Sequence, residues 1–362
     1  MATFQEAKTV DGRETEDWSE PPPSGRGSDY AELSRRVKRA GLLDRRPAYY
    51  AAKIALTIVL LAAEWTAFFL LGDSWWQLAT AVFLAFGFTQ VGFLGHDAGH
   101  RQVFRTRRGN GVAGLVFGNL LIGLSYGWWV GKHNRHHSNP NHVDLDPDVT
   151  VGAIAFTADQ ARAKQGLTRV IARHQAYLFF PLLLLEAAHL HAASVRAVVR
   201  GTVRSSPLEA LLLLVHGVGY LAAVLLVLSP LRAAAFLLLQ QGLFGLYLGC
   251  CFAPNHKGMP ILEEGKEPDY LRRQVLTSRN VRGSRVVDFL MGGLNYQIEH
   301  HLFPSMPRPN LRRAQPLVRA FCAERGVSYS ESSVFGSYGE ALRHLHEAGV
   351  PLRTAVADAV ID

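Results

Sequence analysis

The sequence predicts an all-α integral-membrane fold in which four transmembrane helices form two hairpins. Three observations lead to this prediction. Apolar residues are concentrated in four runs, each close to the roughly 20 residues that a helix needs to cross a bilayer. Very short turns join these runs in pairs. Histidines cluster at the ends of the runs and in the polar segments, which indicates a metal site beside the spanning helices.

The four runs cover residues 51–71, 75–94, 208–228 and 231–252. Residues 72–74 join the first pair, and Ser229 and Pro230 join the second pair. Neither turn has room for a folded domain, so each pair is predicted to be a hairpin. Glu64 and His216 are ionisable residues inside the runs, where such groups usually face the interior of a helix bundle or a cavity.

Two further apolar stretches, 112–130 and 177–188, are interrupted or short. The first is rich in glycine, and the second contains Pro181. We predict interfacial or re-entrant helices for both, with a third hairpin as the alternative.

The chain carries a net charge of +8 over 362 residues, and its basic residues are unevenly placed. Lys and Arg crowd residues 31–53, 101–204 and 257–285, whereas the two tight turns hold almost none. The positive-inside rule therefore puts both termini and the large middle loop in the cytoplasm. We expect no nucleic acid partner, because no stretch interleaves basic residues with exposed aromatic residues in a soluble context.

The composition divides the chain into three parts. Residues 1–30 are rich in Ser, Pro, Gly and acidic residues, and they are predicted to be a disordered tail without a signal peptide. Residues 31–330 form the membrane domain, and residues 331–362 form a C-terminal cytosolic extension. The three cysteines give no disulfide framework, which fits a reducing compartment.

Eight of the fifteen histidines fall in four short motifs. They are His96 and His100 in HDAGH, His133, His136 and His137 in HNRHH, His256 in PNH, and His300 and His301 in QIEHH. Residues three or four apart on a helix stand on one face, about 5–6 Å apart at Cβ, so HDAGH can hold one ion. The adjacent pair in HNRHH can point at two ions. Imidazole suits iron, zinc, copper and nickel alike.

All four motifs fall on one side of the predicted membrane. His96 directly follows the second run, His256 follows the fourth, and the other two motifs lie in segments assigned to the cytoplasm. Solvated loop histidines are the alternative for any single motif, but four motifs at one depth favour a shared metal centre. HDAGH also lacks the glutamate of the zinc-protease motif HExxH.

The motifs HDAGH, HNRHH and QIEHHLFP resemble the three histidine boxes of membrane fatty acid desaturases, over residues 45–330. Gln297, the first residue of the third motif, resembles the glutamine at the same place in front-end (Δ5/Δ6-like) and related bacterial acyl desaturases. The resemblance implies a non-haem di-iron centre that uses O₂ as a co-substrate. It also implies four spanning helices and an acyl-chain tunnel under a helical cytosolic cap.

The resemblance assigns metal-ligand roles residue by residue. The matching residues are His96, His100, His133, His136, His137, His300 and His301, with His256 as the extra histidine before the third box. Gln297 stands where other desaturases have a histidine, and it binds metal either directly or through water. In the stearoyl-type branch, an asparagine at the position of Phe252 holds a metal-bound water. Here Asn255 either takes over this role or is simply an asparagine at the end of a helix.

Further residues near the motifs are candidates for supporting roles. Carboxylates that would orient the imidazole rings are Asp97, Asp144, Asp146 and Glu299. Tyr126, Trp128 and Trp129 precede the second motif and either line a tunnel mouth or belong to an aromatic belt, which we favour. His142 is the best further metal candidate among the remaining histidines.

The resemblance implies an O₂-dependent oxidoreductase that introduces a double bond into a fatty acyl chain, carried as acyl-CoA or acyl-lipid. No haem-binding HPGG of a fused cytochrome b5 domain is present. We therefore expect a separate electron donor, such as ferredoxin, cytochrome b5 or a flavin/iron–sulfur reductase. A fatty acid hydroxylase, acetylenase or sphingolipid desaturase on the same scaffold is the nearest alternative. A membrane zinc hydrolase, a metal transporter or a non-catalytic scaffold is more distant.

Overall fold

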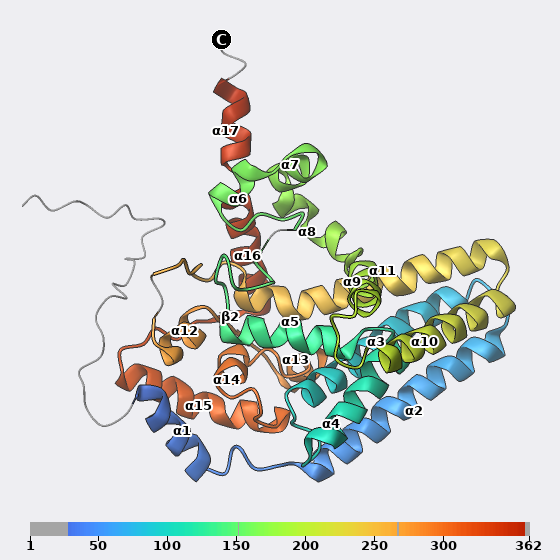
Figure 1. Ribbon diagram of the computed structural model, residues 1–362, viewed down its shortest axis with the longest axis horizontal. Coiled ribbons are helices and arrows are strands. Elements are labelled where there is room, and N and C mark those ends of the chain that lie inside the picture. The colour runs from blue at the N-terminus through green and yellow to red at the C-terminus, as the bar shows by residue number, and fades with distance from the viewer. Residues whose placement is uncertain (1–27, 151, 266–267, 359–362) are drawn as a thin grey trace, which may run out of the picture.

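The computed structural model describes residues 28–150, 152–265 and 268–358, and their regular secondary structure is almost entirely helical (Figure 1). The strands in this part of the chain are β1 (Asn280–Arg282) and β2 (Glu331–Ser333), which form one parallel pair. The predicted all-α fold is therefore confirmed. Most of the predicted disordered tail, residues 1–27, lies outside the described residues.

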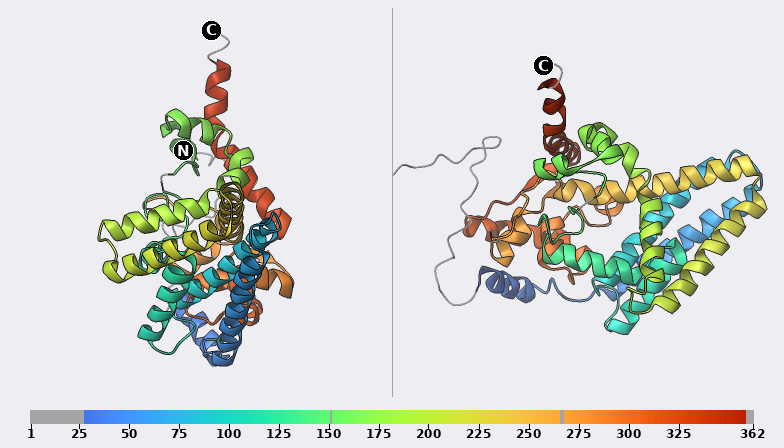
Figure 2. Two further views of the ribbon diagram at one scale, coloured as in Figure 1. Left: turned by 90° about the vertical axis from the view of Figure 1, so that its right-hand side faces the viewer. Right: turned by 45° about the horizontal axis from the view of Figure 1, so that its top comes forward.

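Four helices are long and apolar enough to cross a membrane, as predicted. They are α2 (Pro47–Leu71), α3 (Gln77–Gly99), α10 (Ser206–Val227) and α11 (Pro230–His256). They run side by side as one bundle (Figures 1 and 2). Helices α3 and α11 continue beyond the predicted ends of their apolar runs, so that each carries a histidine motif on its last turn.

Helix α3 lies at the centre of this bundle. It packs against both α2 and α11. Within the apolar windows of the spans, 67% of the residues are buried in α3 but only 22% in α2 and 11% in α10. Large apolar side chains such as Leu70 and Leu226 are exposed on the outer helices. This pattern fits helices whose outer faces contact lipid.

The two ambiguous apolar stretches form bent helix pairs. The first pair is α4 (Arg107–Gly114) with the π-helix η1 (Leu115–Leu121), followed by α5 (Tyr126–Ser138) after a bend of 113°. The second pair is α8 (Gln175–Leu183) and α9 (Glu186–Val199), bent by 68°. Such geometry suits a broken span or a re-entrant loop, so the described residues contain four helices that are long and apolar enough to cross a membrane, or up to six such spans if each bent pair counts as one.

One side of the region beyond the spans is built from helices α1 (Asp29–Arg39), α12 (Tyr270–Leu276), α14 (Gln297–Leu302) and α15 (Arg308–Glu324). Leu33, Leu271, Ile298 and Phe321, one from each helix, are fully buried in a shared apolar core. Helix α13 (Arg285–Leu290) precedes α14. The core fixes α14, which carries the third histidine box.

The other side contains helices α6 (Ala158–Ala163), α7 (Gly166–Arg173), α16 (Val334–Ala348) and α17 (Pro351–Asp358), with α6, α7 and α17 at the top of Figure 1. Helix α16 packs against α8 and α11. The buried Arg279 guanidinium donates to the carbonyl oxygens of Pro254 (2.6 Å) and Lys257 (2.8 Å) and pairs with Glu340 of α16 (2.5 Å). Arg279 thereby fixes the end of α11 on which His256 lies.

Candidate metal centre

The eight motif histidines come together at one end of the helix bundle. His96 lies on the last turn of α3, and His100 is its C-cap residue. The HNRHH histidines lie on α5, His256 ends α11, and His300 and His301 lie on α14. Seven of the eight are buried, and His133 is partly buried. Segments about 200 residues apart in sequence therefore meet at one site.

Four of the histidines form a first group: His96, His100, His133 and His300. Each offers a ring nitrogen within 4.8 Å of those of the others. The ring centroid of His96 lies 4.7 Å from that of His100 and 4.8 Å from that of His300. The Nε2 atoms of His100 and His133 are 2.9 Å apart. Converging ring nitrogens are the arrangement that one metal ion requires.

Three further histidines form a second group: His136, His256 and His301. Their ring centroids make a triangle with sides of 4.7, 4.7 and 5.0 Å. His137 stands between the two groups, with its ring 4.6 Å from that of His100 and 4.2 Å from that of His301. The adjacent residues His136 and His137 thus face different sides of the site.

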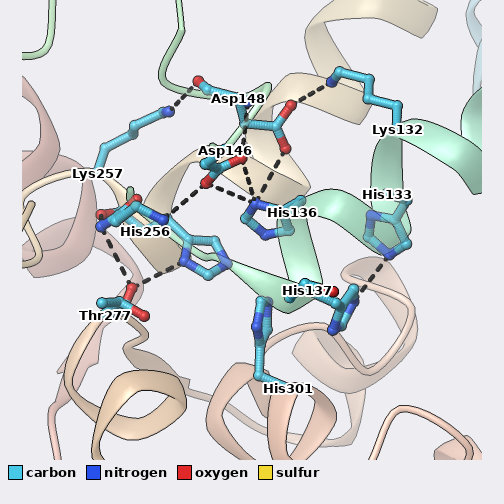
Figure 3. A network of polar contacts seen from close by, with 12 residues as sticks. Lys132, His133, His136, His137, Asp146, Asp148, His256, Lys257, Thr277 and His301 are labelled. Atoms are coloured by element: carbon cyan, nitrogen blue, oxygen red, sulfur yellow. Dashed lines mark hydrogen bonds and ion pairs between the residues drawn. The ribbon is translucent and has the colours of Figure 1, made fainter. Parts of the chain in front are cut away.

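Hydrogen bonds orient every ring of the second group, and Figure 3 shows those of His136 and His256. His136 Nδ1 lies 2.9 Å from Asp146 Oδ2, and His256 Nδ1 lies 3.0 Å from the carbonyl oxygen of Thr277. His301 Nδ1 lies 3.0 Å from Gln274 Oε1. Since all three partners are acceptors, Nδ1 carries the proton and each Nε2 has a lone pair, which in His256 faces the amide nitrogen of Gln297.

The unsatisfied nitrogens of the site also fit a metal. Nε2 of His96, His300 and His301 is buried with no hydrogen-bond partner among the described residues. An unpaired buried polar atom costs about 1–3 kcal/mol, which a metal bond would remove. Burial, together with the neighbouring imidazoles, holds the pKa of His300 and His301 well below the ordinary range. Both rings are therefore neutral and can act as ligands.

Gln297 lies beside the second group, but its oxygen faces away. Asn255 Nδ2 donates to the carbonyl oxygen of Cys251 (3.0 Å) and to Gln297 Oε1 (3.3 Å). Gln297 Nε2 then lies 2.9 Å from His256 Nε2. Phe252 lines a cavity beside the histidines.

The four candidate carboxylates have different surroundings. Asp146 is fully buried and contacts His136, whereas Asp144 is exposed. Asp97 pairs with the buried Arg308 (2.6 Å) and lies 3.5 Å from His96 Nδ1. The Glu299 carboxylate accepts hydrogen bonds from Asn280 Nδ2 (2.8 Å) and Tyr329 Oη (2.7 Å), and burial raises its pKa to about 7. Of these four carboxylates, Asp146 makes the shortest contact with a motif imidazole.

A cavity of about 310 Å³ leads to both histidine groups. His96 and His133 of the first group and His136 and His256 of the second line it. Gly92, Ile122, Leu190 and Leu248 contribute apolar walls away from the histidines, as in a channel for a hydrocarbon chain.

The aromatic candidates divide at this cavity. Tyr126 and Trp129 line it, and the Trp129 ring stacks on His133 at 4.4 Å. Trp128 instead packs beside Val198 and Val203, outside the lining. His142 is buried but belongs to neither histidine group.

Several residues that hold the site were not predicted from the sequence. Thr277 contributes a backbone carbonyl and Gln274 an amide, neither of which has a motif. The buried Glu209 of α10 accepts hydrogen bonds from Ser125 Oγ (2.6 Å) and Asn119 Nδ2 (3.0 Å) at the bend before α5. An acidic residue at the edge of an apolar run is a signal that could have identified Glu209.

Comparison with known proteins finds similarity to one enzyme family over most of the chain. The sequence model of the family described as "Fatty acid desaturase" matches residues 73–333. The chain is 32% identical to an acyl-lipid (9-3)-desaturase of Physcomitrium patens, over 88% of this chain and 62% of the moss protein. It is 31% identical to a Delta(6)-fatty-acid desaturase of Caenorhabditis elegans, over 87% of this chain and 74% of that protein. It is 30% identical to a Delta(5) fatty acid desaturase of the same worm, over 91% and 76%.

Proposed function

Because the chain belongs to the fatty acid desaturase family, we propose that it uses O₂ to introduce a double bond into a fatty acyl chain at a pair of iron ions. One observation carries the proposal. Imidazoles from four separate parts of the chain converge in two groups beside a cavity with apolar walls. A C–H bond of an alkyl chain needs a strong oxidant, which ordinary side chains do not supply.

The two histidine groups would each hold one ion. The first group offers His96, His100, His133 and His300, and the second offers His136, His256 and His301, with His137 beside both. When bound, the iron pair would supply O₂ activation. The acyl chain would lose two hydrogens, and O₂ would be reduced to two waters with two further electrons and two protons.

The protein's own residues position the reactants and exclude water. Asp146, Gln274 and the Thr277 carbonyl hold the second-group rings with Nε2 toward the site. Trp129 and Phe252 lie beside the histidines and shield the cavity from bulk water. An acyl chain would lie along the apolar walls, with one C–C bond beside the histidines. By similarity to the Delta(5) and Delta(6) relatives, that bond would lie near the carboxyl end.

The proposal includes an orientation in the membrane. The histidine centre and both termini would face the cytoplasm, because basic residues crowd the segments around the centre. A single cysteine placed in the α2–α3 turn of a cysteine-free variant would then react with an impermeant maleimide only from the outer side. Reaction from the cytoplasmic side would contradict this orientation.

The electrons would come from a protein of the ferredoxin, cytochrome b5 or flavin/iron–sulfur reductase class. Turnover by the purified chain should begin when one of these donors and its reductase are added. Product formation with dithionite but with none of the donors would show that the donor belongs to another class.

The central test is expression in a host of known lipid composition, followed by mass spectrometry that locates new double bonds. We expect a desaturated acyl chain and about two irons per chain. His136→Ala should abolish the product, while the matched control His346→Ala, an exposed histidine outside both groups, should not. A hydroxylated chain without a double bond, or one zinc and no iron, would refute the proposal.

A further inference from the structure

The cavity beside the histidines has one charged section that the proposed reaction does not use. Lys132, Asp148, Glu186 and Lys257 line it, and the rest of the lining away from the histidines is mainly apolar. The side chains of Lys132, Asp148 and Glu186 are between 28% and 35% exposed, so this section is where the cavity meets solvent. A fatty acyl substrate has one polar end, which needs a place of this kind.

These charges are tied closely to the metal centre. Asp148 pairs with Lys132, and its Oδ2 lies 3.5 Å from Nδ1 of His136 (Figure 3). Lys257 Nζ donates to the carbonyl oxygen of Asp148 at 3.1 Å and lies 3.8 Å from the centre of the Phe156 ring. Lys132 therefore pairs with a carboxylate that lies beside a histidine of the second group, and Lys257 holds the backbone of the same residue.

The balance of charge selects the chemistry of the ligand. Lys132 and Lys257 supply two positive charges, and Asp148 and Glu186 supply two negative charges. A fully ionised carboxylate or phosphate would meet no net positive field here. An ammonium has three N–H donors, so Lys132 can keep its bond to Asp148 and still donate to a neutral oxygen. An ester or thioester carbonyl is such an oxygen.

We propose that Lys132 and Lys257 hold the carbonyl oxygen of an esterified acyl chain, and so fix which carbons reach the histidines. The inference rests on the proposed desaturase function and adds to it the site of the substrate's polar end. Asp148 contacts both Lys132 and His136. The acyl chain would therefore pass the metal centre a few carbons beyond its carbonyl. The position of the double bond is then counted from the carbonyl and not from the methyl end.

The test uses membranes from a host that expresses the full chain and supplies its own electron carriers. One 18-carbon acyl chain is offered in three forms: as a phosphatidylcholine ester, as a coenzyme A thioester and as the free acid. We expect the wild type to desaturate the ester or the thioester at one position and the free acid at least about ten-fold less efficiently. The form that gives product identifies the carrier, and equal use of the free acid would overturn the proposal.

The variant Lys132→Met removes the donor and keeps the length of the side chain. We expect its KM for the accepted ester to rise about ten-fold or more, because a hydrogen bond to a charged group is lost. The double bond should spread over neighbouring carbons, while kcat and bound iron stay near wild type. Lys132→Arg keeps donors and should keep a single double-bond position. The matched control Arg135→Met changes an exposed basic residue on the same helix, outside the cavity lining.

Two failures are distinguishable in this experiment. If the wild type desaturates none of the three forms, the proposed function itself fails. If the wild type is active and Lys132→Met keeps the wild-type KM and double-bond position, only the carbonyl site is overturned. Should Lys132→Met not accumulate in membranes, Lys257→Met is judged by the same two measurements.

Discussion

Asn255 Nδ2 donates a hydrogen bond to Gln297 Oε1 at 3.3 Å, and this contact sets which end of the Gln297 amide faces the histidines. The same Nδ2 donates to the backbone carbonyl of Cys251, which can only accept, so the Asn255 amide has one allowed orientation. Gln297 must therefore accept from Asn255, and its NH₂ group lies against Nε2 of His256. Gln297 thus presents a donor, not a metal-binding oxygen.

This orientation predicts that Gln297→Ala binds as much iron as the wild type. His256 lies in the second histidine group, so His256→Ala should lose about one of the two irons. Iron per chain, measured on purified protein in detergent, separates the two variants. Loss of an iron in Gln297→Ala would make Gln297 a ligand and would contradict the amide orientation.

Asp146→Asn should weaken the metal site of the second group. Asp146 accepts the Nδ1 proton of His136, and loss of such a partner typically costs 10–100-fold in metal affinity. Competition with a calibrated iron chelator measures the change. Asp144→Asn is the matched control, because Asp144 is exposed and two residues away in the same loop. Equal effects of the two variants would mean that the carboxylate acts only through general charge.

The sequence did not predict which of Asp144 and Asp146 contacts a histidine. The histidine motifs were enough to name the residues that meet in the two groups, because helical spacing and the ends of the spans constrain them. The DLDPD segment is a loop, so periodicity does not tell which carboxylate turns inward. The Thr277 carbonyl belongs to the backbone and has no side-chain signature at all.

The spans illustrate the same limit for the fold. Hydropathy located all four helices, since about 20 apolar residues admit few other structures in a bilayer. It did not resolve the 113° bend before α5, which depends on Glu209 from a distant helix. Contacts between groups that are about 80 residues apart leave no local pattern in a single sequence.

Removing one partner of the buried Asp97–Arg308 pair should destabilise the protein by about 3–5 kcal/mol, because the other charge stays buried and unpaired. We expect Arg308→Met to lower the thermal unfolding midpoint in detergent and the double variant with Asp97→Asn to recover part of the loss. Arg312→Met breaks the more exposed pair with Asp288 and should change stability by about 0–1 kcal/mol. Similar midpoints for Arg308→Met and Arg312→Met would contradict the prediction.

Two glycines on α5 give a sharp test of how the HNRHH helix is held. A Cβ at Gly127 would lie 2.4 Å from both Glu209 Oε1 and Val203 Cγ1, whereas a Cβ at Gly131 would meet no atom within 4 Å. Gly131→Ala should therefore be neutral or stabilising by about 0.5–1 kcal/mol, because alanine favours the helix.

Gly127→Ala should push α5 away from Glu209 and displace the three histidines that this helix carries. We expect it to lower the unfolding midpoint and to lose iron from both groups, since α5 contributes His133 to the first and His136 to the second. Iron content and the unfolding midpoint are measured on both variants side by side. If Gly127→Ala retains two irons and wild-type stability, Glu209 does not fix α5, and the position of the HNRHH histidines must depend on their own packing alone.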